Sequence, residues 1–168
     1  MDLAEALIKK GVLKNRRLIG AFRKVDRAWF VQKNENDLAY VDEPLPIGYG
    51  QTISQPRTVA FMLELLDPRP GDNIMEIGYG SGWVTALITV CGANVYAIER
   101  IPELCEWGKK NFGKWAARLE ALPQAQIFQD LAQTGGASRA IPQQRDMRVL
   151  KNFGAETLDD ILPEAFAA

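Results

Sequence analysis

The chain has 168 residues, of which 47% are hydrophobic and 24% are charged, a composition typical of one globular domain with a buried core. With 20 Lys and Arg against 21 Asp and Glu, the net charge is −1, which gives no chain-wide attraction to nucleic acid or to an anionic membrane. Because the chain has no histidine, His-based catalytic triads and metal sites that rely on imidazole are excluded.

The two cysteines, Cys91 and Cys105, lack the spacing of a metal site, which favours a reducing compartment. The first residues lack the basic and apolar regions of a signal peptide, and no apolar run reaches the ~20 residues that span a bilayer. We therefore expect a cytoplasmic protein with no metal, no nucleic-acid partner and no membrane association.

Residues 1–38 are predicted to form N-terminal helices. Residues 2–10 place acids early and lysines late, as the helix dipole favours. Asn15 is a suitable N-cap for a second amphipathic helix at 15–24. These helices either cap the main body or simply add to its core, and the sequence leaves both interpretations open.

Residues 39–56 are predicted to form a shaped loop, because two prolines and two glycines oppose a helix and weaken a strand. A long irregular segment in a compact domain usually serves function. Helical periodicity returns at 57–66. Ser54 lies shortly before this helix, where it could serve as an N-cap.

A strand, a glycine turn and a helix are predicted next. Residues 74–77 are a short apolar run that suits a buried parallel strand, and Gly78, Gly80 and Gly82 break it sharply. Glycines reach positive φ and let a ligand approach without meeting a Cβ. The helix predicted at 83–91 would present unpaired N–H groups at the same place.

Two carboxylates flank this turn. A second apolar run at 95–98 ends in Glu99, where an acid can accept hydrogen bonds from ribose hydroxyls. Glu76 precedes the first glycine; it would repel a pyrophosphate and attract the cationic amino and sulfonium groups of S-adenosylmethionine. We therefore favour a site for S-adenosylmethionine over one for NAD. The alternative is that the glycines only form a tight turn.

Two motifs, in the same order along the chain, resemble the protein-L-isoaspartate O-methyltransferase family over roughly residues 1–115. They are Leu45-Pro-Ile-Gly-Tyr-Gly-Gln-Thr-Ile-Ser-Gln-Pro56 and Met75-Glu-Ile-Gly-Tyr-Gly-Ser-Gly82, the latter followed by Ala97-Ile-Glu-Arg100. The resemblance implies an α/β fold, a Rossmann-like methyltransferase sheet with an N-terminal helical cap. It also implies methyl transfer from S-adenosyl-L-methionine to the free carboxylate of L-isoaspartyl residues in damaged proteins, which is a protein repair reaction.

The resemblance assigns roles to individual residues. Ser54 is expected in the active site as a hydrogen-bond donor to the substrate carboxylate, with a plain helix N-cap as the alternative. Together with the glycine motif, the resemblance gives these cofactor-binding residues: Ile53, Gln55, Pro56, Glu76, Gly78, Gly80, Ser81, Gly82, Glu99 and Arg100. It places these residues beside the peptide substrate: Pro46, Ile47, Gly48, Gln51 and Thr52.

We expect one methyltransferase-like domain over residues 1–168, with an active-site loop at 39–56, a cofactor-binding core at 57–130 and a divergent tail at 131–168. The family's sheet has seven strands, and each strand with its crossover takes about 30 residues. Residues 100–168 are too few for the remainder, so fewer strands are expected. A homo-oligomer could cover the sheet edge that this leaves.

The segment after Glu99 leaves two assignments open. A helix is predicted at 103–122. Residues 125–128 could then form the third strand, with Asp130 just beyond it. Alternatively, residues 128–137 match the family's fourth strand and the third is deleted. The polar residues 129–148 are predicted to form a loop.

Three hypotheses follow for function. The first is an isoaspartyl methyltransferase or a close relative. The second is a module that binds S-adenosylmethionine but is catalytically impaired. The third is a remnant that keeps part of the fold without either function.

Overall fold

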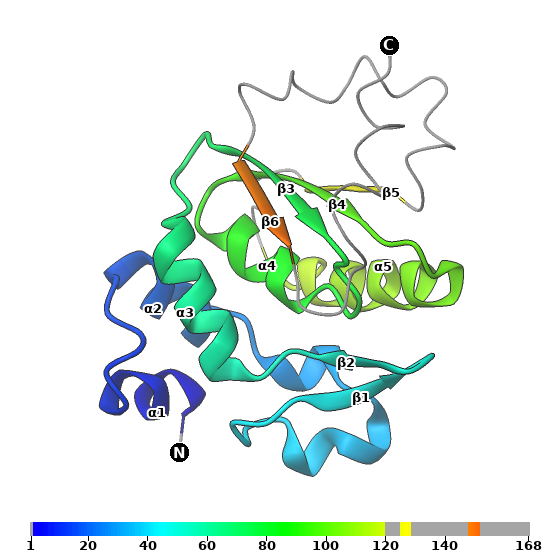
Figure 1. Cartoon of the computed structure of the whole chain (residues 1–168), viewed down its shortest axis with the longest axis horizontal. Helices are drawn as coiled ribbons and strands as arrows, with labels where there is room; N and C mark the ends of the chain where they lie inside the picture. Colours follow the sequence, from blue (N-terminus) through cyan, green and yellow to red (C-terminus); the bar gives the residue numbers. More distant parts are fainter. Residues whose placement is uncertain (1, 120–124, 129–147, 152–168) are drawn as a thin grey trace.

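The computed structural model describes residues 2–119, 125–128 and 148–151. Within these residues a four-stranded sheet packs on helices, with a two-stranded hairpin and several short helices beside it (Figure 1). The α-helices are α1 (Leu3–Lys9), α2 (Arg16–Lys24), α3 (Pro56–Leu66), α4 (Trp83–Val90) and α5 (Pro102–Ala116), and the 3₁₀ helices are η1 (Arg27–Phe30) and η2 (Lys33–Leu38). The strands are β1 (Leu45–Gly48), β2 (Gln51–Ile53), β3 (Asn73–Ile77), β4 (Asn94–Ile98), β5 (Ala125–Phe128) and β6 (Arg148–Lys151).

The larger sheet is parallel throughout, in the order β5-β4-β3-β6. Its two central strands, β3 and β4, are buried along nearly their whole length, as parallel strands covered by other elements require. They run in register, so that Ile77 at the end of β3 pairs with Ile98 at the end of β4. The predicted strands at 74–77 and 95–98 and the α/β, Rossmann-like fold are confirmed.

Helices α4 and α5 lie on the same face of the sheet (Figure 1), as two successive right-handed crossovers in one direction require. Every residue of α4 from Trp83 to Thr89 is buried. This helix is therefore enclosed between the sheet and the N-terminal helices, which explains its almost uniformly apolar sequence. Among the residues that the structure describes, no helix is long and apolar enough to cross a bilayer.

The N-terminal helices begin at side-chain caps. Asp2, Asn15 and Asp26 each accept a hydrogen bond from the backbone N–H two residues further on, at the starts of α1, α2 and η1. Each cap satisfies one N–H that has no partner inside its helix. The predicted helices at 2–10 and 15–24, and the cap at Asn15, are confirmed.

These N-terminal helices share a hydrophobic core with the helices of the sheet. Phe22 of α2 packs edge-on against Trp83 of α4, with ring centroids 5.8 Å apart. Phe30 of η1 packs against Trp115 of α5 at 6.1 Å. Both rings of each pair belong to one cluster of buried residues that runs from α1 to α5. The N-terminal segment therefore adds to the core, which is one of the two interpretations left open by the sequence.

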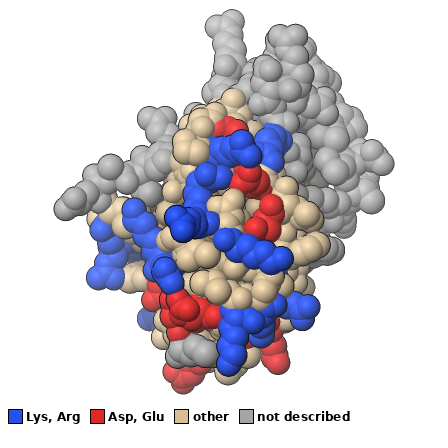
Figure 2. Space-filling view, turned by 90° about the vertical axis from the view of Figure 1, so that its left-hand side faces the viewer, with Lys and Arg blue, Asp and Glu red and all other residues tan. Residues whose placement is uncertain are grey.

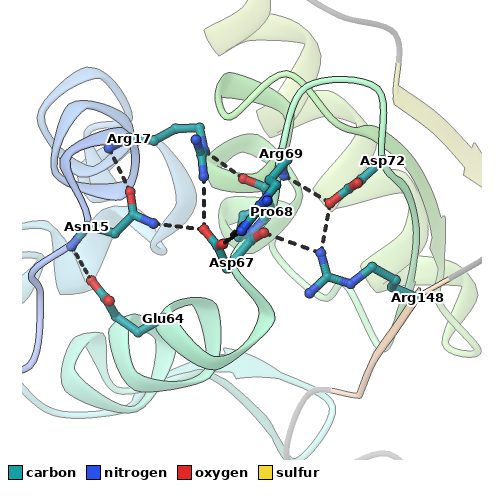
Figure 3. A network of polar contacts seen from close by, with 8 residues as sticks. All are labelled: Asn15, Arg17, Glu64, Asp67, Pro68, Arg69, Asp72 and Arg148. Carbon is teal, nitrogen blue, oxygen red and sulfur yellow. Dashed lines mark hydrogen bonds and ion pairs between the residues drawn. The ribbon is translucent and has the colours of Figure 1, made fainter.

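A network of polar contacts joins α2, the loop after α3 and β6 (Figure 3). Arg17 Nη2 and Asn15 Nδ2 both donate to Asp67 Oδ1, each at 2.8 Å. Arg148 Nη1 donates to Asp72 Oδ2 at 2.7 Å and to the Asp67 carbonyl at 3.3 Å. Exposed pairs of this kind contribute about 0–1 kcal/mol each. Within the network, Arg148 connects β6 to the loop after α3.

Charges of both signs are mixed over the face of the molecule that Figure 2 shows. Near the N-terminus, Arg23 pairs with Glu5, and Lys10 pairs with Asp42 of the segment before β1. Arg17 and Arg23, each of which lies beside another basic residue in the sequence, thus meet acidic partners.

The loop predicted at 39–56 is wrong in part, because β1 and β2 form an antiparallel hairpin within it. Its turn includes Tyr49 at a φ of 54°, which is uncommon for a residue with a side chain. Leu45, Ile47 and Ile53 are each 4% exposed. Burial of these alternate positions against the core favours strand structure despite the nearby prolines and glycines.

The C-terminal predictions are partly corrected. Helix α5 ends at Ala116, not at residue 122, although Leu119 in the following turn still packs against the core. Strand β5 pairs with β4, so the first assignment of 125–128 is confirmed and the deleted third strand is wrong. Strand β6, which begins at Arg148, falls at the end of a predicted loop. Asp130 lies outside the described residues.

Helix α5 approaches the glycine turn through Gly108. A Cβ at this position would lie 2.3 Å from the Gly80 carbonyl oxygen and 2.6 Å from Tyr79 Cε2. The Tyr79 hydroxyl also donates to the Cys105 carbonyl at 2.7 Å. Helix and turn therefore fit together only because residue 108 has no side chain.

We predict opposite effects for two glycine substitutions in this helix. Gly108→Ala should lower the free energy of unfolding by about 1–3 kcal/mol, because the methyl group displaces the turn. Gly113→Ala, where a Cβ meets nothing within 4 Å, should raise it by about 0.5–1 kcal/mol through helix propensity. Urea unfolding followed by circular dichroism measures both, and equal effects would contradict the packing described.

Candidate active site

The glycine turn lies where the carboxyl ends of β3 and β4 meet, at the edge of the sheet where parallel α/β folds bind ligands. Gly78, Gly80 and Gly82 have φ values of 76°, 52° and 85°, so the predicted need for glycine at all three positions is confirmed. The N–H groups of Gly78 and Tyr79 donate to the Ile98 carbonyl at 2.8 and 3.2 Å. These bonds join the turn to the end of β4.

Glu99 completes this connection with its side chain. Its Oε2 accepts from the Gly80 N–H at 3.0 Å, and its Oε1 accepts from the Ile101 N–H at 3.0 Å. The side chain is 7% exposed. A carboxylate has about four acceptor sites and only two are used by these bonds, so Glu99 keeps the capacity to accept from the hydroxyls of a sugar.

Glu76 is fully buried, with 0% of its surface exposed. Its Oε2 accepts from the Thr85 hydroxyl at 2.6 Å, across the glycine turn from β3 to the first turns of α4. A buried carboxylate is costly unless it is hydrogen-bonded or paired with a cation. Its position therefore suits a cationic group of a ligand held beside the turn.

The hairpin and α5 both pack against the glycine turn. A Cβ at Gly80 would lie 3.1 Å from Ile47 Cδ1, and a Cβ at Gly82 would lie 3.1 Å from the Gly108 carbonyl oxygen. Both glycines are thus required by the packing of this chain on itself. The sequence predicted glycine here for positive φ and for the approach of a ligand, and the structure adds packing within the chain as a further reason at these two positions.

The residues expected beside the peptide substrate divide between two faces of the hairpin. Ile47 is buried against the turn, whereas Pro46 and Thr52 pair with each other and are exposed on the outer face. Gly48 and Gln51 pair at the end of the hairpin and are half-buried. The structure therefore places Ile47 against the glycine turn and Pro46 and Thr52 on the outer face of the hairpin.

Ser54 and its neighbours connect the hairpin to α3. The cap of α3 is Gln55, without a side-chain capping bond, and Pro56 takes the first helical position, so the N-cap interpretation of Ser54 is wrong. Ser54 is half-buried, and its carbonyl accepts from Arg27 Nη2 at 3.1 Å. Gln55 Nε2 donates to the Asp42 carbonyl at 2.7 Å. Ile53 is buried at the end of β2.

The two remaining residues expected to bind the cofactor, Ser81 and Arg100, differ in burial. Ser81 is 3% exposed, and its carbonyl accepts from Asn111 Nδ2 of α5 at 3.5 Å. Arg100 is exposed beside Glu99, at the start of the connection to α5. Ser81 thus belongs to the inner wall of the turn and Arg100 to its rim.

Sequence reasoning missed several residues that shape this site: Arg27, Tyr79, Thr85, Gly108 and Asn111. Tyr79 lies within the glycine motif, but the sequence assigned no role to its side chain, and the other four lie outside the two motifs. Each acts through contacts that only the folded chain creates. The hydroxyls of Thr85 and Thr89, in a helix that is otherwise apolar, were signals that could have indicated buried polar partners.

Comparison with known proteins gives the family. The family model described as "Protein-L-isoaspartate(D-aspartate) O-methyltransferase (PCMT)" matches residues 1–135. A protein-L-isoaspartate O-methyltransferase of Aeropyrum pernix is 44% identical over 70% of this chain and 46% of its own length. One of Pyrococcus horikoshii is 50% identical over 64% of this chain and 49% of its own length. The chain thus spans about half the length of these relatives.

A solved structure gives the same fold. It is a putative protein-L-isoaspartate O-methyltransferase of Plasmodium falciparum in complex with S-adenosyl-L-homocysteine. The two share 22% identity and a TM-score of 0.73 over 98% of this chain and 78% of the other. On the family match and the identity to archaeal relatives, this chain belongs to the protein-L-isoaspartate(D-aspartate) O-methyltransferase family.

Proposed function

We propose that this protein transfers a methyl group from S-adenosyl-L-methionine to the free carboxylate of L-isoaspartyl residues in damaged proteins. The observation that carries the proposal is a pair of buried carboxylates, Glu76 and Glu99, at the ends of neighbouring strands and on either side of a glycine turn. Membership of the family supports the reaction and the substrate.

The site residues suit this cofactor chemically. Glu76 offers negative charge for the amino or sulfonium group, and Glu99 offers acceptors for the ribose hydroxyls. When bound, S-adenosylmethionine supplies an activated methyl group on a positively charged sulfur. The buried carboxylate of Glu76 would oppose the pyrophosphate of a dinucleotide, which is a reason to prefer this cofactor.

The chemistry needs no general base. The isoaspartyl carboxyl group has a pKa near 4, so it is an anion at neutral pH, and the chain has no histidine that could act as a base. A carboxylate oxygen forms the new bond to the methyl carbon while the carbon–sulfur bond breaks and its electron pair stays on sulfur. The chain's task is alignment, for which the Ser54 hydroxyl is the proposed donor to one carboxylate oxygen.

The product is a methyl ester, which can close to a succinimide and reopen partly as aspartate, and this completes the repair. The proposed partners are therefore isoaspartyl proteins or peptides. We place the protein in the cytoplasm, where its cysteines, Cys91 and Cys105, would stay reduced; both are free and buried. A homo-oligomer that covers an edge of the sheet is a further part of the proposal; among the described strands, β6 and β5 form the two edges.

A second candidate function is binding of S-adenosylmethionine without turnover. It is favoured by one observation, that the two buried carboxylates at the glycine turn suit the cofactor whether or not a methyl group is transferred. The two candidates differ in a single assay. Labelled S-adenosylmethionine and an isoaspartyl peptide should give a base-labile methyl ester if the chain is an enzyme. Calorimetric binding with no ester above background would support the second candidate.

Ser54→Ala should lower methyl transfer by about 10²-fold, because a donor to the reacting carboxylate is lost. The affinity for S-adenosylhomocysteine should stay within about threefold, since this hydroxyl is not proposed to hold the cofactor. Ser54→Thr keeps a hydroxyl at the same carbon and should retain more activity than Ser54→Ala. Equal rates for the wild type and Ser54→Ala would remove Ser54 from the mechanism.

Thr85→Val should weaken both the fold and the cofactor site. It removes a donor to the buried Glu76 carboxylate, at a cost of about 1.5–3 kcal/mol. Thr89→Val is the matched control one turn later, because Thr89 is equally buried but donates to the Thr85 carbonyl at 2.7 Å; it should cost less than about 1 kcal/mol. Chemical unfolding and titration with S-adenosylhomocysteine measure the two effects. The same result for both variants would show that Glu76 does not depend on Thr85.

A further inference from the structure

Arg27, the first residue of η1, is buried among carbonyl groups. Its Nη1 donates to the carbonyls of Ala39 and Val41 at 3.1 and 3.2 Å. Its Nη2 donates to the carbonyls of Glu43 and Ser54 at 3.0 and 3.1 Å. The residue is 1% exposed. One guanidinium group thus holds the chain that leads into the hairpin and the chain that leaves it.

The same guanidinium also contacts the start of α4. Arg27 Cζ lies 5.1 Å from the ring centroid of Trp83, which is the first residue of α4 and directly follows the glycine turn. A guanidinium over an aromatic face is attracted by the ring quadrupole, and more so when water is excluded. The two planar groups therefore fix the base of the hairpin relative to the start of α4.

Burying the charged guanidinium of Arg27 costs free energy, so a contribution to stability does not by itself explain its position. Burial lowers the pKa of Arg27 to about 10, although the negative charge of Asp42 opposes that shift, so the group stays charged at neutral pH. Within the described residues, Arg27 Nε is buried without a hydrogen-bond partner. A buried cation with incomplete pairing is weak evidence for a stabilising role. The four carbonyl bonds of Arg27 instead indicate a role in holding the segments on either side of the hairpin.

We propose that Arg27 is a positioning residue that sets the register between the Ser54 segment and the glycine turn. This inference rests on the proposed function of Ser54 as the donor to the substrate carboxylate. Arg27 touches no reacting atom. It acts through the Ser54 carbonyl on one side and through the Trp83 ring on the other, so that the hydroxyl and the cofactor site keep one relative position.

Only arginine has the shape for this task. The guanidinium is planar, with donors arranged as a fork, and its flat face can stack on an aromatic ring. A lysine at the same position has three donors on one nitrogen and cannot reach four carbonyls on two sides or stack. Arg27→Lys therefore keeps the positive charge but removes the forked arrangement of donors and the planar face that stacks on Trp83.

Arg23→Lys is the matched control, because Arg23 is an exposed arginine near the end of α2, four residues before Arg27, and it pairs with Glu5. Arg27→Lys should lower kcat with an isoaspartyl peptide by between about tenfold and a hundredfold, as small misplacements of reacting groups do. The dissociation constant for S-adenosylhomocysteine should change less than about threefold. Arg23→Lys should change neither. A loss confined to cofactor affinity would overturn the proposal.

A double-mutant cycle separates positioning from general damage to the fold. If Arg27 acts through Ser54, then Arg27→Lys should cost less than about threefold in kcat on a Ser54→Ala background. Equal losses on both backgrounds would show that the two residues act independently, which would overturn the proposal.

Hydrogen exchange tests the positioning without any catalytic readout. Arg27→Lys should speed amide exchange of residues 39–55 by about tenfold or more, whereas exchange in α1 should match the wild type. A variant with unchanged exchange at 39–55, or one that is unfolded throughout, would overturn the proposal. If the wild-type protein forms no methyl ester but exchange still accelerates at 39–55, the proposed function fails while Arg27 keeps its positioning role.

Discussion

The site depends on one carboxylate, that of Glu99, the residue directly after β4. It accepts hydrogen bonds from two backbone N–H groups. By accepting from Gly80 and from Ile101, it fastens the glycine turn of the neighbouring strand to the start of the connection that leads to α5. This contact is available because β3 and β4 run parallel and in register, with Ile77 opposite Ile98. The residue after each strand then lies at the same edge of the sheet.

Three other segments, the hairpin, α5 and α2, pack against the glycine turn or the residue that follows it. Ile47 of the hairpin contacts Gly80, the backbone of α5 at Gly108 contacts the turn from beneath, and Phe22 of α2 packs on Trp83. The candidate site thus needs the two central strands, their helices and the N-terminal half of the chain. All of these lie in the part of the chain that the structure describes, although the chain spans only about half the length of its curated relatives.

Local signals predicted much of this fold. The glycine turn, the strands on either side and the cap at Asn15 follow from short-range rules of backbone conformation and hydrogen bonding, and the structure confirms them. The hairpin did not follow from such rules, because its strand structure depends on burial of Leu45, Ile47 and Ile53 against distant residues. The end of α5 was missed because Leu119 keeps the helical periodicity while packing from a turn.

The residues around the site were predicted to the extent that they belong to motifs. Glu76 and Glu99 could be assigned from the strands and the glycine motif, but Arg27 could not, since it lies in a short segment that matches neither motif. Its burial and its four carbonyl partners exist only after the chain segments on either side of the hairpin have come together. Long-range contacts of this kind leave no periodic trace in the sequence.

The most direct test of the site is calorimetric titration of the wild type and of Glu99→Gln with S-adenosylhomocysteine and with NAD. The account predicts one-to-one binding of S-adenosylhomocysteine, weakened about tenfold or more in Glu99→Gln because the carboxylate loses its charge, and no binding of NAD. Preference for NAD, or equal affinity of both proteins for S-adenosylhomocysteine, would contradict it.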